Sequence, residues 1–160
     1  MNIDADVKSI SKLKDYFFLV PDYQREYVWK PEDQVEQFMI DIENEFDVDS
    51  NLSQNNYFIG SIIIVKNKEK HDVVDGQQRL TTIMICLCVF RDLLKSKENI
   101  LNPIQKKYLQ NIEELLFDFD METDQTKARL KLQYHESCDY LDNLIQGNSN
   151  SVIDKTPSIV

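Results

Sequence analysis

The chain has 160 residues with only three glycines and four prolines, which suits one domain with long regular elements and argues against a low-complexity protein. Its formal net charge of −10 repels a phosphate backbone, so the chain alone is a poor candidate for non-specific DNA binding. Residues 1–6 are acidic where a secretory signal would be basic, so we expect no such signal. The longest apolar stretch, residues 80–90, is too short for a membrane span, which needs about 20 residues.

The cysteines and histidines exclude a zinc site and indicate a cellular compartment. Cys86, Cys88 and Cys138 are odd in number, and two of them lie in an apolar run, which favours reduced thiols and a cytoplasmic location. His71 and His135 are the only histidines, and their spacing from the cysteines does not supply four zinc ligands. We therefore expect no zinc, and we also expect no haem and no flavin.

The first third of the chain predicts a helix, a strand and a second helix. Residues 9–14 suit a short helix, and residues 16–20 suit a strand that Pro21 ends. Residues 22–29 are polar and aromatic without a clear period, which predicts an ordered loop. Pro31, followed by two acids, begins a helix whose apolar face comprises Val35, Phe38, Met39, Ile42 and Phe46. A polar loop is expected at residues 47–56.

The middle of the chain predicts a β-hairpin followed by a long helix. Residues 57–65 and 71–74 are rich in strand-forming side chains and flank a turn at residues 67–70. Asp75 and Gly76 end the second strand. A helix then begins at Gln77 or Gln78 and runs to about Lys97. It is apolar almost all round, so we expect it to be the central, buried helix.

The last third predicts two more helices. Asn102 followed by Pro103 caps the first of them, and its buried face is expected to comprise Ile104, Tyr108, Ile112, Leu115, Leu116 and Phe119. An acidic loop is expected at residues 118–125 and a short strand at residues 130–132. The final helix spans residues 136–146 and ends at Gly147, with four side chains directed inward: Cys138, Leu141, Leu144 and Ile145.

The predicted domain covers residues 1–147. Residues 148–160 are polar and predict a linker that leads to a region this chain does not contain.

The turn between the second hairpin strand and the buried helix reads Asp75-Gly76-Gln77-Gln78-Arg79. A helix N-terminus offers free N–H groups and a partial positive charge, so a phosphate fits there. Gly76 permits a positive φ or a close approach of the backbone. Gln77 and Gln78 add amide donors, and Arg79 can bind phosphate oxygens as a fork. Thr81 and Thr82 add hydroxyls, and Asp75 is a candidate to hold magnesium or orient a water.

The same turn also fits a purely structural interpretation. Asp75 would then be an N-cap and Arg79 a surface ion-pair partner. Spacing alone leaves both interpretations open. The sequence contains neither the P-loop pattern nor the Gly-x-Gly-x-x-Gly pattern, so a nucleotide bound here would be held outside those two schemes.

Residues 23–29 form a second constellation, with one arginine, one amide and three aromatic side chains in seven positions. Such a loop can stack a base and clamp a phosphate, with Gln24 and Arg25 as the polar donors. The alternative is a packed loop, in which Trp29 anchors the core and Arg25 pairs with Asp22 or Glu26. For Trp29 we favour the core, and for Arg25 both interpretations stay open.

Three stretches resemble signatures of a known family: residues 20–29 with the pattern Val-Pro-x-Tyr-Gln-Arg-x-Tyr-x-Trp, residues 58–62 and residues 73–82 around the motif at 75–79. A weaker block lies at residues 128–132. In this order and at this separation, they resemble the GmrSD restriction endonuclease N-terminal domain family over about residues 9–147. The resemblance implies an α+β fold similar to the ParB/sulfiredoxin superfamily, in which a small mixed sheet packs with helices and the C-terminal part is helical. It also implies nucleotide hydrolysis that regulates restriction of modified or foreign phage DNA.

The resemblance also implies roles for individual residues. The residues at 75–79 would form the nucleotide site, faced by Gln24 and Arg25, and a nucleoside triphosphate with Mg²⁺ would be the ligand. Many relatives carry an HNH-like nuclease in a C-terminal region. This chain has only two histidines and no such motif, so it is not expected to cut DNA by that route. DNA would be contacted through that missing region or a partner subunit.

Three functions remain open at this point. The first is a nucleoside triphosphate-binding and -hydrolysing regulatory domain of a bacterial restriction or anti-phage protein. The second is a ParB-like DNA-binding module without hydrolysis, against which the net charge argues. The third is a subunit-docking domain whose motif is only a cap and an ion pair. The number of subunits is also open, and a homo-oligomer is one arrangement.

Overall fold

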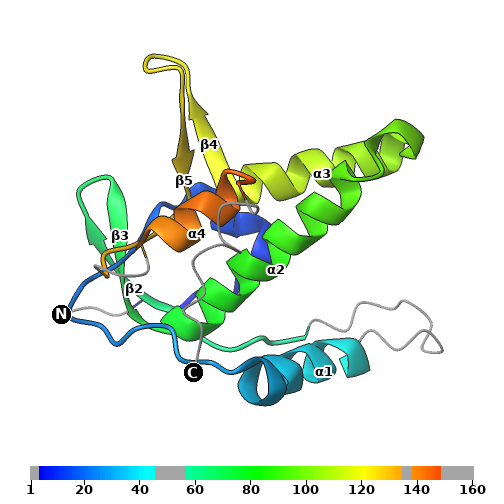
Figure 1. Cartoon of the computed structure of the whole chain (residues 1–160). Helices are drawn as coiled ribbons and strands as arrows, with labels where there is room; N and C mark the ends of the chain where they lie inside the picture. Colours follow the sequence, from blue (N-terminus) through cyan, green and yellow to red (C-terminus); the bar gives the residue numbers. More distant parts are fainter. Residues whose placement is uncertain (1–3, 46–56, 135–137, 149–160) are drawn as a thin grey trace, which may run out of the picture.

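A mixed four-stranded sheet organises the structure, a computed structural model that describes residues 4–45, 57–134 and 138–148 (Figure 1). Its strands are β1 (Phe18–Val20), β2 (Ile63–Asn67), β3 (Lys70–Asp75) and β6 (Leu130–Leu132), in the order β2-β3-β1-β6. The predicted hairpin is the antiparallel pair β2 and β3. The central strand β1 is parallel to both β3 and β6, with Phe18 opposite His71 on one side and Leu130 on the other.

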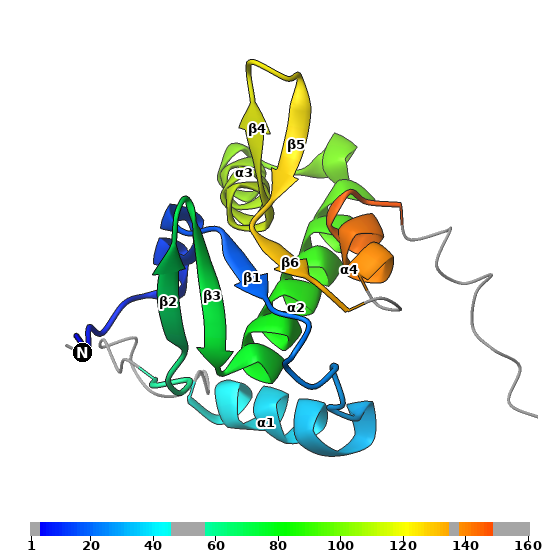
Figure 2. The same ribbon diagram turned by 90° about the vertical axis from the view of Figure 1, so that its left-hand side faces the viewer.

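One face of this sheet is buried against the helix α2 (Gln77–Lys95), which lies behind the strands in Figure 2. Side chains alternate between the two faces of a strand, and the inward ones include Phe18, Val73 and Leu130. They meet Leu80 and Met84 of α2 in the hydrophobic core. On the opposite face, the large apolar side chains of β2 and β3 stay about half exposed: Ile63, Val65 and Val74.

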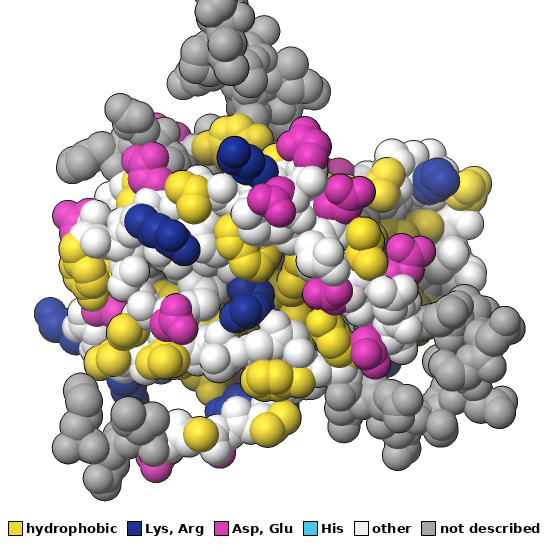
Figure 3. All heavy atoms as spheres, turned by 90° about the horizontal axis from the view of Figure 1, so that it is seen from below, with side chains coloured by type: hydrophobic (Ala, Val, Ile, Leu, Met, Phe, Trp, Pro, Cys, Tyr) yellow, Lys and Arg dark blue, Asp and Glu magenta, His cyan; other side chains and the backbone are white. Residues whose placement is uncertain are grey.

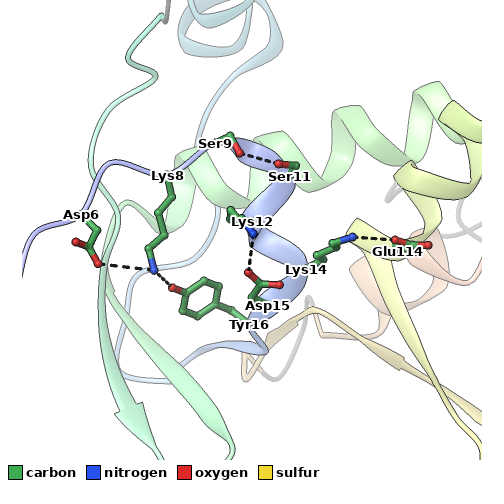
Figure 4. Close-up of polar contacts among 9 residues, drawn as sticks. All are labelled: Asp6, Lys8, Ser9, Ser11, Lys12, Lys14, Asp15, Tyr16 and Glu114. Atoms are coloured by element: carbon green, nitrogen blue, oxygen red, sulfur yellow. Dashed lines mark hydrogen bonds and ion pairs between the residues drawn. The ribbon is translucent and has the colours of Figure 1, made fainter.

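The other helices surround α2 (Figure 1). The turn η2 (Pro31–Val35) runs into α1 (Glu36–Glu45), and η3 (Glu98–Ile100) connects α2 to α3 (Pro103–Leu116). A hairpin of β4 (Phe117–Asp120) and β5 (Gln125–Ala128) projects from the body, and α4 (Cys138–Ile145) follows β6. The short helix η1 (Ile10–Asp15) lies before β1. An ion pair of 3.1 Å between Lys14 and Glu114 joins it to α3 (Figure 4).

Local signals at helix ends are confirmed. Helical structure begins at Pro31, and α3 begins after an Asn102 cap whose side chain accepts a hydrogen bond of 2.9 Å from the N–H of Gln105. The Gln105 side chain accepts in return from the N–H of Asn102, which completes a capping box. The α+β class is likewise confirmed by the mixed sheet and the helices packed on it.

Several predictions of burial and extent were wrong. Residues 118–125, expected to be an acidic loop, form most of the β4–β5 hairpin, because the Asp120 carboxylate accepts hydrogen bonds from the N–H groups of Glu122 and Thr123 and so stabilises the turn. In α3, Leu115 and Leu116 are buried as expected, but Ile104 and Tyr108 are exposed. Leu109 is buried in addition, so the buried face of the helix is turned away from Ile104 and Tyr108.

Two apolar helices are also less buried than expected. Only Phe38 is buried in α1. The second half of α2 carries half-exposed side chains, Val89, Phe90 and Leu93. Phe46, the loop at residues 47–56, the start of the last helix at Glu136 and the side chain of Cys138 lie outside the described residues. Within the described ranges, no helix has both the length and the apolar character to cross a membrane.

A buried arginine joins α4 to α2. Arg91 of α2 is 1% exposed, and its guanidinium donates hydrogen bonds to the carbonyl oxygens of Ile145 and Leu144, the latter at 2.6 Å. Carbonyl groups in the last turn of a helix lack partners within the helix and carry partial negative charge. Arg91 therefore satisfies both groups and places a cation where the dipole of α4 favours it.

We predict that Arg91→Met lowers the free energy of unfolding by about 2–4 kcal/mol, because it removes the guanidinium that donates to the Ile145 carbonyl and leaves the Leu144 carbonyl with only the N–H of Gly147. Lys95→Met is the matched control in the same helix. It removes only the partly exposed ion pair with Glu113 and should change the free energy by less than about 1 kcal/mol. Urea unfolding followed by circular dichroism measures both, and equal effects would contradict the role given to Arg91.

Candidate functional site

A cleft opens where the parallel strands end. Parallel strands present their carboxyl ends at one edge of a sheet, where open sheets bind ligands. Here the loop after β1, residues 22–29 (the Arg25 loop), meets the turn after β3 and the start of α2. The cleft has a volume of about 380 Å³, within the range of roughly 300–1,000 Å³ typical of small-molecule sites. Its walls comprise Gln24, Arg25, Trp29, Ser61, Val74, Asp75, Gly76, Gln77, Gln78 and Arg79.

The start of α2 is not capped by any side chain. Gly76 is the N-cap residue, with φ of 82°, and the first hydrogen bond of the helix runs from the N–H of Leu80 to the Gly76 carbonyl. The interpretation of Asp75 as a structural N-cap was therefore wrong. Because no side chain caps this end, the first N–H groups and the positive end of the helix dipole are available to a ligand in the cleft.

Gly76 is required by the neighbouring backbone as well as by its positive φ. A Cβ atom here would lie 2.7 Å from the carbonyl oxygen of Ser61 and 3.1 Å from the Cα of Ile62. The close approach predicted for Gly76 is thus an approach to the chain that enters β2. It fixes the start of α2 against that chain.

The Arg79 side chain packs against Gly60, where the lack of a Cβ atom leaves space for it. A Cβ atom on Gly60 would come within 2.6 Å of the Arg79 Cζ, so only glycine leaves room for the guanidinium. The Nη1 group of Arg79 donates a hydrogen bond of 3.0 Å to the Ser61 carbonyl. Among the described residues, Arg79 takes part in no salt bridge, so the ion pair of the structural interpretation is not observed there. The role of Gly60 was not predicted, although it lies in the second block of the family signature.

The side-chain amides of Gln77 and Gln78 bind the Arg25 loop, which corrects the expectation that they cradle phosphates. Gln78 donates to the carbonyl of Glu26 and accepts from the N–H of Val28, both at 2.9 Å. Gln77 donates to the carbonyl of Arg25 at 3.1 Å. Both glutamines are 7% exposed. Burial makes these bonds valuable, because an amide withdrawn from water must find partners in the protein.

Thr81 and Thr82 are not part of the cleft, contrary to the prediction. Both are buried and lie outside its walls. The hydroxyl of Thr82 donates to the Gln78 carbonyl and shares a hydrogen bond with Tyr27, each at 2.8 Å. The Thr82 hydroxyl therefore joins α2 to the Arg25 loop through Tyr27.

The Arg25 loop contributes a cation and an aromatic ring to the cleft. Gln24 is bound to the Val74 carbonyl at 3.1 Å, which attaches the start of the loop to β3. Arg25 is exposed, and no salt bridge of the described residues includes it, so the pairing with Asp22 or Glu26 is not observed. Trp29 is half-buried. Its ring packs on the ring of Phe38, with the two centroids 5.8 Å apart, and it also lines the cleft. The interpretation of Trp29 as a core anchor therefore holds only in part.

The titratable side chains of the cleft are two guanidinium groups, on Arg25 and Arg79, and the carboxylate of Asp75. The surface that carries α1, seen from below in Figure 3, mixes both signs of charge with hydrophobic side chains and has no extended basic patch. Within the cleft, the two guanidinium groups are the charge that could attract an anion. This charge lies beside the positive end of α2, where it adds to the helix dipole.

The comparisons agree with the sequence signatures. A family model described as GmrSD restriction endonuclease, N-terminal domain, matches residues 7–159. This range contains all three signature stretches and every residue of the cleft. No curated protein matches the chain.

We predict that Gly76→Ala lowers the free energy of unfolding by about 2–4 kcal/mol, because it combines an unfavourable positive φ with a backbone clash. Gly147→Ala is a matched control. Gly147 has a similar φ of 80°, but a Cβ atom there meets nothing closer than 3.9 Å, so the cost should be about 1 kcal/mol. Chemical denaturation of both variants tests this difference, and equal losses would mean that the contact with Ser61 is unimportant.

Proposed function

The chain belongs to the GmrSD restriction endonuclease N-terminal domain family, and on that premise we propose that it binds and hydrolyses a nucleoside triphosphate as the regulatory domain of a bacterial restriction protein. The restriction system would act on modified or foreign DNA, including phage DNA. The observation that carries this proposal is the cleft at the uncapped start of α2, with Arg25 and Arg79 in its walls.

The start of α2 is the proposed site for the phosphates. The helix has 19 residues, so its peptide dipoles add up along several turns, and its N–H groups at residues 77–79 precede the first intrahelical hydrogen bond. These groups would donate to phosphate oxygens as backbone amides. In this proposal the backbone of Gln77 and Gln78 contacts the ligand, while their side chains hold the Arg25 loop.

The two arginines would neutralise the charge of the phosphate chain. Arg79 comes from the first turn of α2 and is oriented by its hydrogen bond to Ser61. Arg25 comes from the loop after β1 and has no competing carboxylate partner among the described residues. One guanidinium group can bind two oxygens of a phosphate at once. It also stabilises the negative charge that develops on the phosphate oxygens in the transition state of phosphoryl transfer.

Asp75 is the proposed protein ligand for magnesium. The described residues contain no group of three or more His, Cys, Asp and Glu side chains that could hold a metal ion. Magnesium in nucleotide sites is often held by only one or two carboxylates, with phosphates and waters as its other ligands, and a single exposed Asp75 fits that donor set. Bound magnesium would supply charge neutralisation to the phosphates, while Asp75 would orient the complex at the mouth of the cleft.

DNA recognition would belong to another part of the restriction protein or to a partner subunit. The net charge of −10 disfavours contact between this chain and a phosphate backbone. Hydrolysis in the cleft would therefore control restriction from a distance. The proposal assigns the chain to the bacterial cytoplasm, where nucleoside triphosphates and reduced thiols such as Cys86 and Cys88 coexist.

We predict that Arg79→Ala weakens nucleotide binding by about 10- to 100-fold, since a charge-assisted hydrogen bond to phosphate is lost. Calorimetric titration of the full chain with ATP, GTP, CTP and UTP, each with magnesium, identifies the ligand and measures the effect. Lys106→Ala removes an exposed cation from α3 and serves as the control. The proposal fails if none of the four nucleotides binds to the unmodified chain.

We predict that Asp75→Asn lowers the rate of phosphate release by roughly 100-fold or more, the usual scale for loss of a group that acts on the reacting atoms. The substitution keeps the size of the side chain and removes its charge. Asp22→Asn, an exposed change in the same region but outside the cleft walls, should leave the rate unchanged. Undiminished hydrolysis in the Asp75 variant would remove this residue from the mechanism.

A further inference from the structure

A buried tyrosine from the C-terminal part of the chain contacts the backbone of the Arg25 loop. Tyr134 follows β6 and is 5% exposed, and its ring belongs to the hydrophobic core. Its hydroxyl lies 2.5 Å from the carbonyl oxygen of Arg25 and 2.7 Å from the Oε1 of Gln77. Because β6 is parallel to β1 and β3, its carboxyl end leads Tyr134 to the same edge of the sheet as the cleft.

We propose that Tyr134 is a positioning residue for the nucleotide: its hydroxyl fixes the backbone of Arg25 and thereby keeps the Arg25 guanidinium at the cleft. This inference rests on the proposed function, because the ligand of that guanidinium is the phosphate chain. Tyr134 itself does not line the cleft. It acts only through Arg25.

The hydrogen bonds around Arg25 explain why this contact matters. The Arg25 carbonyl accepts from two donors, the Tyr134 hydroxyl and the Gln77 amide, whereas the Arg25 side chain has no ion-pair partner among the described residues. The orientation of the guanidinium is thus set from the backbone. Two further residues of the loop, Glu26 and Val28, are bound by the side chain of Gln78. Without these bonds the loop would gain conformational freedom that a ligand must remove on binding.

The Tyr134 hydroxyl keeps its proton and can therefore always donate a hydrogen bond. Burial raises the pKa of Tyr134, and the nearby carboxylate of Glu26 raises it further, so the phenol stays protonated near neutral pH. The single proton of the hydroxyl is shared between the Arg25 carbonyl and the Oε1 of Gln77, and Tyr134→Phe removes it from both acceptors. The substitution keeps the ring and therefore its packing in the core.

The decisive experiment is a double-mutant cycle in nucleotide affinity, measured on the full chain with the nucleotide that binds best. We expect Tyr134→Phe to weaken binding by roughly three- to tenfold, the scale of one net hydrogen bond. In the background of Arg25→Ala, the same substitution should add less than about a twofold effect, because the group it positions is gone. Tyr140→Phe, an exposed change on α4, is the control and should have no effect.

A purely structural role for Tyr134 would give a different result. The loss caused by Tyr134→Phe would then be equal in both backgrounds, and that additivity would overturn the proposal. Unchanged affinity in the single Tyr134→Phe variant would overturn it as well.

Hydrogen exchange separates this inference from the nucleotide proposal. Peptides that cover residues 23–29 should exchange roughly three- to tenfold faster in Tyr134→Phe, while peptides from the buried half of α2 keep their protection. Unchanged exchange in the loop would refute the ordering role of the hydroxyl. If the unmodified chain binds no nucleotide, the proposed function fails, and the exchange result alone decides whether Tyr134 orders the loop.

Discussion

The site depends on the parallel pairing of β1 with β3 and β6. Strands that run in the same direction deliver the residues after them to one edge of the sheet, and three separate parts of the chain meet there. The Arg25 loop follows β1, the start of α2 follows β3, and Tyr134 follows β6. A shift of one residue in the register of the three-residue strand β1 would turn Phe18 and Val20 out of the core and displace the loop as well. Core packing and site geometry are therefore one constraint.

The features that the sequence predicts well are those with a local cause. Proline and acids at a helix start, an asparagine cap before Pro103, and a glycine between a strand and a helix each act within a few residues. The membership of the cleft was largely predicted for the same reason, since residues 75–79 are contiguous. The loop at residues 22–29 joined them through its resemblance to a family signature, which the family match over residues 7–159 confirms.

The features that could not be predicted depend on contacts between distant parts of the chain. A glutamine amide offers the same donors to a phosphate as to a backbone carbonyl, so nothing local says that Gln77 and Gln78 face the Arg25 loop. Tyr134 lies more than 100 positions from Arg25 and carries no local signal of their contact. The apolar period of α3 likewise does not reveal that Ile104 stays exposed, because the contacting side of a helix is set by its neighbours.

Trp29 makes the cleft observable by intrinsic fluorescence. It is the only tryptophan of the chain, and it stands in the wall of the cleft with its ring against Phe38. Indole emission responds to the polarity of its surroundings and to rings stacked on it, whereas the seven tyrosines emit at shorter wavelength. The unlabelled protein thus carries a single indole fluorophore, whose emission wavelength and intensity report on the cleft.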